Sequence, residues 1–272
     1  MSKKVTTFEH DMELQKLSKT RAKELHALAN KKERDSSGLF MVEGEKTLMD
    51  SISFFHLRQL VCLPDWIEHH GDLLRAHGDK ILVASPVTMS MVTTLSSAPS
   101  VIGIFEKPCY PEVIDSLSPD GLYLLLDDVQ DPGNLGTIIR TCDWFGVYDI
   151  FASPGTADVY SPKVVKSAMG SLSRVRVRYI DLSLLIENNR GVKVIGTLLK
   201  GIPLEEYSEG LKGFLLMGNE GKGISEELKN KIEIGITIPP YDSRNHPDSL
   251  NVAIATAVIL SHRNARLTKE SN

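Results

Sequence analysis

Three places in the chain combine glycine, asparagine and charged residues directly after an apolar run. They are the segments 127–140, 218–223 and 239–251. Glycine lets a backbone approach a ligand closely, and amide, carboxylate, hydroxyl and guanidinium groups can form hydrogen bonds to that ligand. The polar residues singled out, in chain order, are Asn134, Arg140, Glu220, Ser249 and Asn251. We interpret the three segments as candidate ligand-binding loops.

The glycines of the second loop, at positions 218, 221 and 223, favour a sharp turn that is open to a ligand. The loop is not GxGxxG, and it lacks the GK[ST] ending of a phosphate-binding loop. It therefore gives no support to binding of a nucleoside triphosphate. Glu220 is unusual among glycines in a plain turn, whereas Ser225 and the two glutamates after it are explained as the start of a helix.

Each of the other two loops also has a purely structural interpretation. Asn134 is placed to cap the helix predicted after the Pro-Gly turn, and Arg140 would then be an exposed helix arginine. Ser249 is a natural N-cap for the apolar stretch that follows it. That interpretation leaves Asn251, a poor helix former, unexplained in the first turn of a very apolar helix.

The second half of the chain predicts a parallel sheet covered on both faces, because short apolar runs alternate there with helix-like stretches. The runs are 122–126, 149–152, 175–179, 192–197, 214–217 and 234–238. Ligands of such sheets collect at the carboxyl ends of the strands, and three of these ends lead into the candidate loops.

The first half predicts a separate, smaller α/β domain. Residues 1–14 are expected to form a loose tail, and residues 15–107 alternate short strands with helices at 45–53 and 67–76. Three prolines and a glycine lie within residues 108–121, so we assign 108–120 to a linker and 121–268 to the second domain.

The segment 15–34 is basic although the chain as a whole has a formal net charge of −4. It carries seven basic side chains against two acidic ones, a net +5. Such a face can contact phosphates, and a solvated helix surface has the same composition. The basic residues are Lys16, Lys19, Arg21, Lys23, Lys31, Lys32 and Arg34.

Other features of the sequence exclude several classes of protein. No stretch approaches the roughly 20 apolar residues of a membrane helix, and the N-terminal residues lack the apolar core of a secretory signal. Cys62, Cys109 and Cys142 form no CxxC pair and no even-numbered framework, so we expect reduced thiols in a cytoplasmic protein. No Cys/His pair has the spacing of zinc ligands, and no metal is expected.

The three loops resemble, in order and spacing, the three motifs of the SpoU family of RNA ribose 2′-O-methyltransferases in the SPOUT superfamily. The matching stretches are DPGNLGTIIRT, LLMGNEGKGIS, and ITIPP followed by SLNVAIATAVIL. Residues 17–52, with the phrase FMVEGEKTL, are similar to the L30e-like RNA-binding domain that many members carry. The loop 240–248 departs from the family pattern, since it is longer than usual and lacks a common glycine.

The resemblance implies an α/β fold in which an L30e-like domain precedes a parallel-sheet domain with a C-terminal trefoil knot. The cofactor would be S-adenosylmethionine, and a side chain at position 218 would intrude on it. Members of the family are homodimers packed through the knot. The residues implied to bind the cofactor are Leu198, Gly218, Asn219, Glu220, Gly221, Ile238 and Leu250.

The resemblance also implies roles for the polar residues. Arg140 would act on the ribose hydroxyl or its neighbouring phosphate, while Asn134, Glu220, Ser249 and Asn251 would position the ribose and hold the first two loops together. The two-domain layout favours rRNA as the substrate. A tRNA methyltransferase, a resistance enzyme that modifies one ribosomal site, and a catalytically silent RNA-binding factor remain as alternatives.

Overall fold

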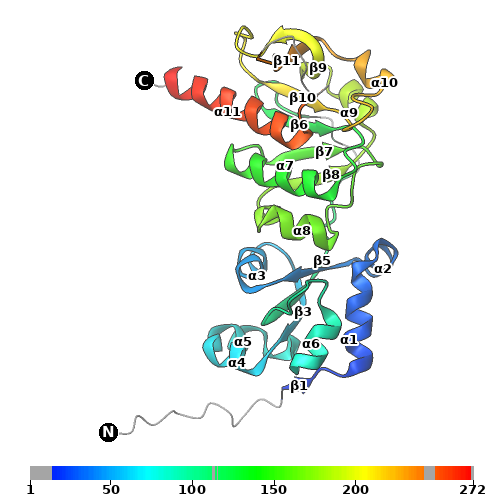
Figure 1. Ribbon diagram of the computed structural model, residues 1–272, viewed down its shortest axis with the longest axis vertical. Helices are drawn as coiled ribbons and strands as arrows, with labels where there is room; N and C mark the ends of the chain where they lie inside the picture. Colours follow the sequence, from blue (N-terminus) through cyan, green and yellow to red (C-terminus); the bar gives the residue numbers. More distant parts are fainter. Residues whose placement is uncertain (1–13, 112–113, 115, 242–248, 271–272) are drawn as a thin grey trace. The chain divides into compact units, whose positions relative to one another are not determined.

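The computed structural model describes residues 14–111, 114, 116–241 and 249–270. It divides into two compact units, residues 1–107 and 108–272 (Figure 1). Residues 1–13 of the expected tail and residues 242–248 of the longer loop lie outside the described residues.

The first unit is built on a five-stranded mixed sheet in the order β1-β4-β3-β5-β2. Strands β1, β4 and β3 are parallel, and β5 runs antiparallel to both β3 and β2. The strands are β1 (Gln15–Lys16), β2 (Leu39–Glu43), β3 (Leu57–Cys62), β4 (Ile81–Val83) and β5 (Val101–Glu106). The small α/β domain predicted from the sequence is confirmed.

The helices of the first unit connect these strands (Figure 1). They are α1 (Lys19–His26), α2 (Lys31–Ser37), α3 (Glu45–Ile52), α4 (Pro64–His69), α5 (Gly71–His77) and α6 (Pro86–Val92), with a 3-10 turn at Ala27–Ala29 and another at Gly78–Lys80. The single helix predicted over 67–76 is wrong. Pro64 starts α4 earlier, and the chain leaves helical geometry at His70 before α5 begins.

The second unit holds a six-stranded sheet in the order β11-β9-β10-β6-β7-β8. Every neighbouring pair of strands is parallel, as the apolar runs predict. The strands are β6 (Leu122–Leu126), β7 (Asp149–Ala152), β8 (Arg176–Tyr179), β9 (Val194–Pro203), β10 (Gly213–Met217) and β11 (Ile234–Thr237). Strand β9 is longer than predicted, because its last residues are exposed and carry no buried apolar pattern.

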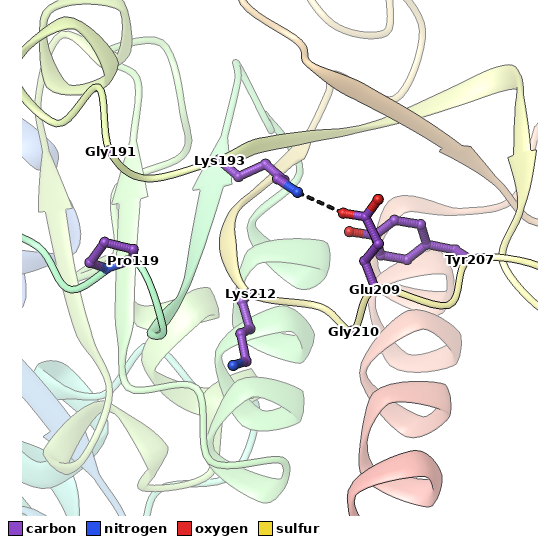
Figure 2. A pocket seen from close by; sticks show the side chains of 7 residues that line it. All are labelled: Pro119, Gly191, Lys193, Tyr207, Glu209, Gly210 and Lys212. Atoms are coloured by element: carbon purple, nitrogen blue, oxygen red, sulfur yellow. Dashed lines mark hydrogen bonds and ion pairs between the residues drawn. The ribbon is translucent and has the colours of Figure 1, made fainter.

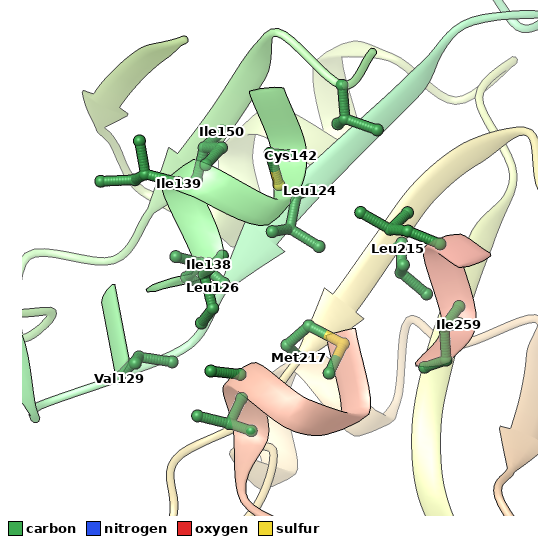
Figure 3. Packing of buried hydrophobic residues seen from close by; sticks show 14 of the residues in the cluster. Leu124, Leu126, Val129, Ile138, Ile139, Cys142, Ile150, Leu215, Met217 and Ile259 are labelled. Carbon is green, nitrogen blue, oxygen red and sulfur yellow. The ribbon is translucent and has the colours of Figure 1, made fainter. Parts of the chain in front are cut away.

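Helices cover both faces of this sheet (Figure 1). They are α7 (Pro132–Trp144), α8 (Pro162–Ala168), α9 (Leu182–Asn188), α10 (Glu226–Lys229) and α11 (Val252–Glu270), with a 3-10 turn at Ser171–Ser173. On one face, Ile138 of α7 and Ile259 of α11 pack in the same cluster as Leu124 and Leu215 of the strands (Figure 3). On the other face, Leu125 packs with residues of α9 and α10. The trefoil knot stays a prediction.

The three cysteine thiols are free. Cys62 and Cys142 are buried in the two cores and Cys109 is exposed. Burial raises the pKa of the Cys62 thiol to about 12, so this thiol is inert at neutral pH. Within the described ranges, no helix is long and apolar enough to cross a membrane.

Gly136 sets how closely α7 packs against α8. A Cβ atom built at Gly136 would lie 2.4 Å from Ser167 Cβ and 3.0 Å from the Val164 carbonyl oxygen. We expect Gly136→Ala to force these two helices apart and to destabilise the fold by about 1–3 kcal/mol. Denaturant unfolding measures this cost, with Gly191→Ala as the control because its Cβ would meet only Pro119 at 4.0 Å. Equal stability of the two variants would contradict this account of the packing.

Candidate functional site

The first loop ends where helix α7 begins, and the residue that caps this helix is Asp131. Its Oδ1 accepts a hydrogen bond from the Asn134 backbone N–H at 2.8 Å. The interpretation of Asn134 as the helix cap is therefore wrong. Because Asp131 satisfies the end of the helix, the side chain of Asn134 is free to bond elsewhere.

The Asn134 side chain joins the first loop to the second. Its Nδ2 donates to Oε1 of Glu220 at 2.9 Å. The same carboxylate accepts from the backbone N–H groups of Gln130, at 3.3 Å, and Asp131, at 3.2 Å. Glu220 therefore holds three donors of the first loop, which explains a glutamate among glycines.

The third loop reaches the same place through Asn251. Its Nδ2 donates to Asn134 Oδ1 at 2.9 Å, and its own Oδ1 accepts from the backbone N–H groups of Ala253, at 2.9 Å, and Ile254, at 3.3 Å. Asn251, and not Ser249, is thus the cap of α11, and this resolves why a poor helix former stands there. We call Asn251, Asn134 and Glu220 the three-loop relay.

The second loop is closed by Asn219. Its backbone forms two hydrogen bonds of 3.0 Å with Gly223, and its Nδ2 donates to the Asp128 carbonyl at 2.7 Å. A Cβ at Gly218 would lie 2.4 Å from the backbone of Gly223. A side chain at position 218 therefore collides with the loop itself, and its intrusion on the cofactor stays a prediction.

Sequence reasoning missed two aspartates at the carboxyl end of β6. Asp127 is buried, and its Oδ2 accepts from the Ser225 backbone N–H at 2.7 Å, so it ties the first loop to the start of α10. Asp128 adopts a positive φ of 59° and receives a hydrogen bond from Gln130 Nε2 at 3.1 Å. The signal in the sequence was an Asp-Asp pair at the end of a buried strand.

Three apolar residues implied to bind the cofactor lie in or next to elements of the second unit: Leu198 within β9, Ile238 directly after β11, and Leu250 two residues before α11. Leu198 and Ile238 are half-buried, and Leu250 is 52% exposed. The backbone of the second loop is also uncovered, because a Cβ at Gly221 would meet only Asn219 Oδ1, at 3.7 Å. Partly exposed apolar side chains and open backbone are the kinds of groups that line a site for an adenosine-containing ligand such as S-adenosylmethionine.

The structure does not bring Arg140 into the relay. Arg140 is exposed on α7, and among the described residues it has no hydrogen-bond or ion-pair partner. It lies six residues after Asn134, a rise of about 9 Å along a helix. Ser249 is exposed, and two residues separate its position from the start of α11. Both residues are open to a bound substrate.

The basic segment of the first unit is exposed, with one exception. Lys16, Lys19, Lys23 and Lys32 are exposed, and Arg21 and Lys31 are exposed but paired with Glu24 and Asp35. Arg34 is buried, and its Nη1 donates to the carbonyls of Leu28 and Ala29 at 2.7 Å each. Arg34 therefore holds the turn before α2, and its assignment to an exposed phosphate-binding face is wrong.

A hollow at the opposite edge of the large sheet does not compete with this site. It lies beside Lys193 and Lys212, which directly precede β9 and β10, and has a volume of about 190 Å³ (Figure 2). Each lysine already has a carboxylate partner, Glu209 at 2.6 Å and Asp120 at 2.9 Å. Within the described part of the chain, no cluster of His, Cys, Asp and Glu could hold a metal ion.

Comparison with known proteins agrees with this geometry. The SpoU rRNA Methylase family matches residues 121–261, and the MRM3-like substrate binding domain matches residues 19–103. The chain belongs to the SpoU rRNA methylase family.

Two relatives of known activity and one solved structure illustrate the likeness. The chain is 31% identical to the 23S rRNA (guanosine(2553)-2′-O)-methyltransferase RlmP of Bacillus subtilis, over 89% of this chain and 95% of the relative. It is 27% identical to the 23S rRNA (uridine(2479)-2′-O)-methyltransferase of Streptomyces viridochromogenes, over 86% and 85%. An AdoMet-bound rRNA methyltransferase from Sinorhizobium meliloti superposes with a TM-score of 0.80 at 31% identity, over 93% and 97%.

The acidic groups of the site predict its response to pH. Partial burial tends to raise the pKa of Glu220, but hydrogen bonds from Asn134 and the backbone outweigh it and lower the pKa. The hydrogen bond from the Asn134 backbone likewise lowers the pKa of Asp131. Ionised, these carboxylates stabilise the fold above their unfolded pKa values, and the contribution is lost as pH falls through the lower folded values.

We therefore expect the melting temperature of the wild type to drop on acidification below about pH 4. The melting temperature of Glu220→Gln should drop less steeply in this range. At neutral pH this variant should be less stable than the wild type, because one amide oxygen cannot replace a carboxylate that accepts from three donors. Thermal unfolding between pH 3 and pH 7 measures both effects, with Glu205→Gln as an exposed control. The same acid dependence in wild type and Glu220→Gln would contradict the assignment.

Proposed function

We propose that the protein is an S-adenosylmethionine-dependent RNA methyltransferase that modifies a ribose 2′-hydroxyl of rRNA. The observation that carries this proposal is the three-loop relay, which joins the three family motifs by side-chain hydrogen bonds of 2.9 Å. The names of the relatives support both the ribose position and the rRNA substrate. The AdoMet-bound relative supports the cofactor.

The cofactor would lie on the second and third loops. Gly218, Asn219, Glu220 and Gly221 would line it on one side, and Leu198, Ile238 and Leu250 would cover its apolar adenine. When bound, S-adenosylmethionine supplies an electrophilic methyl group on a positively charged sulfur. Because Asn219 and Glu220 are already fixed by hydrogen bonds, little reorganisation is needed on binding.

Arg140 is our candidate for the group that acts on the ribose. A ribose hydroxyl is a poor nucleophile at neutral pH, so transfer requires orientation and stabilisation of the charge that develops on its oxygen. A guanidinium with a pKa above about 12 is a reluctant base. We assign Arg140 to stabilising this oxyanion and clamping the adjacent phosphate, with Asn134, Ser249 and Asn251 positioning the ribose.

The first unit is proposed to bind the RNA, and a second copy of the chain to complete the enzyme. The MRM3-like match and the exposed lysines of α1 and α2 support the RNA assignment. Ile254 and Val258 of helix α11 are large apolar side chains that are 53% and 39% exposed, which supports a homodimer through that helix. With rRNA as its substrate, we expect the protein to work in the cytoplasm.

Of the rival functions, only the silent RNA-binding factor differs from the proposal in what it requires of these residues. A silent RNA-binding factor needs no intact relay, and the relay here has all its hydrogen bonds. An enzyme that modifies tRNA, or one that confers resistance at a single ribosomal site, would use the same site. Of these substrates, rRNA is favoured by the relatives that match most of the chain.

Arg140→Ala should lower the rate of methyl transfer by about two to three orders of magnitude and leave S-adenosylmethionine affinity nearly intact. Arg140→Lys should restore little, because a point charge cannot reproduce the planar guanidinium. Single-turnover transfer of labelled methyl to rRNA measures the rate, and calorimetry on the same samples measures binding. Lys166→Ala, an exposed change on the neighbouring helix α8, is the control. Near-normal transfer by Arg140→Ala would overturn the mechanism.

Charge reversal on the first unit should weaken RNA binding without changing cofactor affinity. We expect the combined change Lys19→Glu and Lys23→Glu to reduce the slope of log K against log salt by about 1 for each phosphate that the protein no longer neutralises. Fluorescence anisotropy with an rRNA fragment at several salt concentrations measures the slope. Lys46→Glu, in the same unit but outside the basic segment, is the matched control. Identical slopes for both variants would show that this face does not bind RNA.

A further inference from the structure

The linker between the two units is attached to the second unit at Tyr110. The guanidinium carbon of Arg178, on the edge strand β8, lies 5.4 Å from the centroid of the Tyr110 ring. The same carbon lies 5.5 Å from the centroid of the Phe151 ring. A cation over an aromatic ring at this distance is a favourable contact, most so where water is partly excluded.

Arg178 is itself held by an ion pair, so it can serve as an anchor. Its side chain is 17% exposed, and its Nη2 donates to Asp149 Oδ1 at 3.0 Å. Asp149 also accepts from Arg176 at 2.6 Å and 2.9 Å. Burial raises the pKa of the Tyr110 hydroxyl, in agreement with a ring packed against the unit.

A second attachment follows along the linker at Asn189. This side chain is buried, 5% exposed, and its Nδ2 donates to the Ile114 carbonyl at 2.7 Å and to the Leu185 carbonyl at 2.8 Å. Its Oδ1 accepts from the Leu117 backbone N–H at 3.0 Å. Ile114 and Leu117 also pack against the apolar cluster under α9. The linker predicted at 108–120 is thus bound to the second unit at several described residues, of which Tyr110 and Ile114 come first along the chain.

These attachments shorten the free tether between the units to Pro108 and Cys109. We propose that Tyr110 is a positioning residue for the RNA substrate, which acts by keeping this tether short. The inference rests on the proposed function, in which the first unit binds RNA and the second methylates it. With both units on one RNA, the effective concentration of the second at its target depends on tether length.

For a tether that already spans the two binding sites, effective concentration falls roughly as the −3/2 power of tether length, and this relation gives the expected size of the effect. Loss of the Tyr110 attachment makes Ile114 the next described anchor, so the tether up to that anchor grows from two residues to about six and the effective concentration falls about fivefold. Insertion of ten Gly/Ser residues before Pro108 lengthens it to about twelve residues and lowers the effective concentration about fifteenfold.

The test compares Tyr110→Ala, Tyr110→Phe and the ten-residue insertion between Lys107 and Pro108 in the full chain. For Tyr110→Ala we expect the KM for an rRNA fragment to rise about fivefold, with kcat and S-adenosylmethionine affinity unchanged. Tyr110→Phe keeps the ring over Arg178 but loses the hydrogen bond between the Tyr110 hydroxyl and Tyr160, so its KM should rise less than that of Tyr110→Ala. The insertion should raise KM further. Leu184→Ala, an exposed change on α9, is the control.

An unchanged KM in the insertion variant would overturn the proposal, and this variant leaves every packed residue in place should Tyr110→Ala fail to fold. Equal losses in Tyr110→Phe and Tyr110→Ala would also overturn it, because the ring would then not be the anchor. Affinity for the same rRNA fragment is measured in parallel. A wild type that binds the fragment but transfers no methyl group refutes the proposed function, while the affinities still report the effect of tether length.

Discussion

The site depends on one carboxylate. Glu220 stands in a glycine-rich loop yet accepts hydrogen bonds from two backbone amides and one side-chain amide of another loop. An acceptor with several lone pairs can satisfy all three donors, whereas a neutral amide cannot. Glu220 also fixes the orientation of Asn134, since the NH₂ group must face the carboxylate and the oxygen must face Asn251. Three segments far apart in sequence are thereby held in one arrangement.

The parallel sheet makes this arrangement possible. Strands β6 and β10 are neighbours with aligned registers, so the loops that follow Leu126 and Met217 leave the sheet side by side. The short polar caps then complete the geometry. Asp131 caps α7, which leaves the side chain of Asn134 available for contact with Glu220. Asn251 caps α11 with its Oδ1 and contacts Asn134 with its Nδ2. Helix capping and site assembly are accomplished by the same few residues.

Much of the fold was predictable from the sequence, because buried parallel strands are continuous apolar runs and five of the six ran close to their predicted bounds. The three motifs identified Asn134, Glu220 and Asn251 as site residues. Which residue caps each helix was not predictable, since Asp131 and Asn134, or Ser249 and Asn251, are chemically equivalent candidates. The burial of Arg34 and the docking of Tyr110 depend on tertiary contacts that no local pattern records.

The most direct test of the central claim is a map of 2′-O-methylated nucleotides in the RNA of cells with and without the gene. If the protein methylates rRNA, one or a few rRNA positions lose their 2′-O-methyl group when the gene is deleted and regain it when the gene is restored. An unchanged rRNA map, or a loss confined to tRNA, would contradict the account.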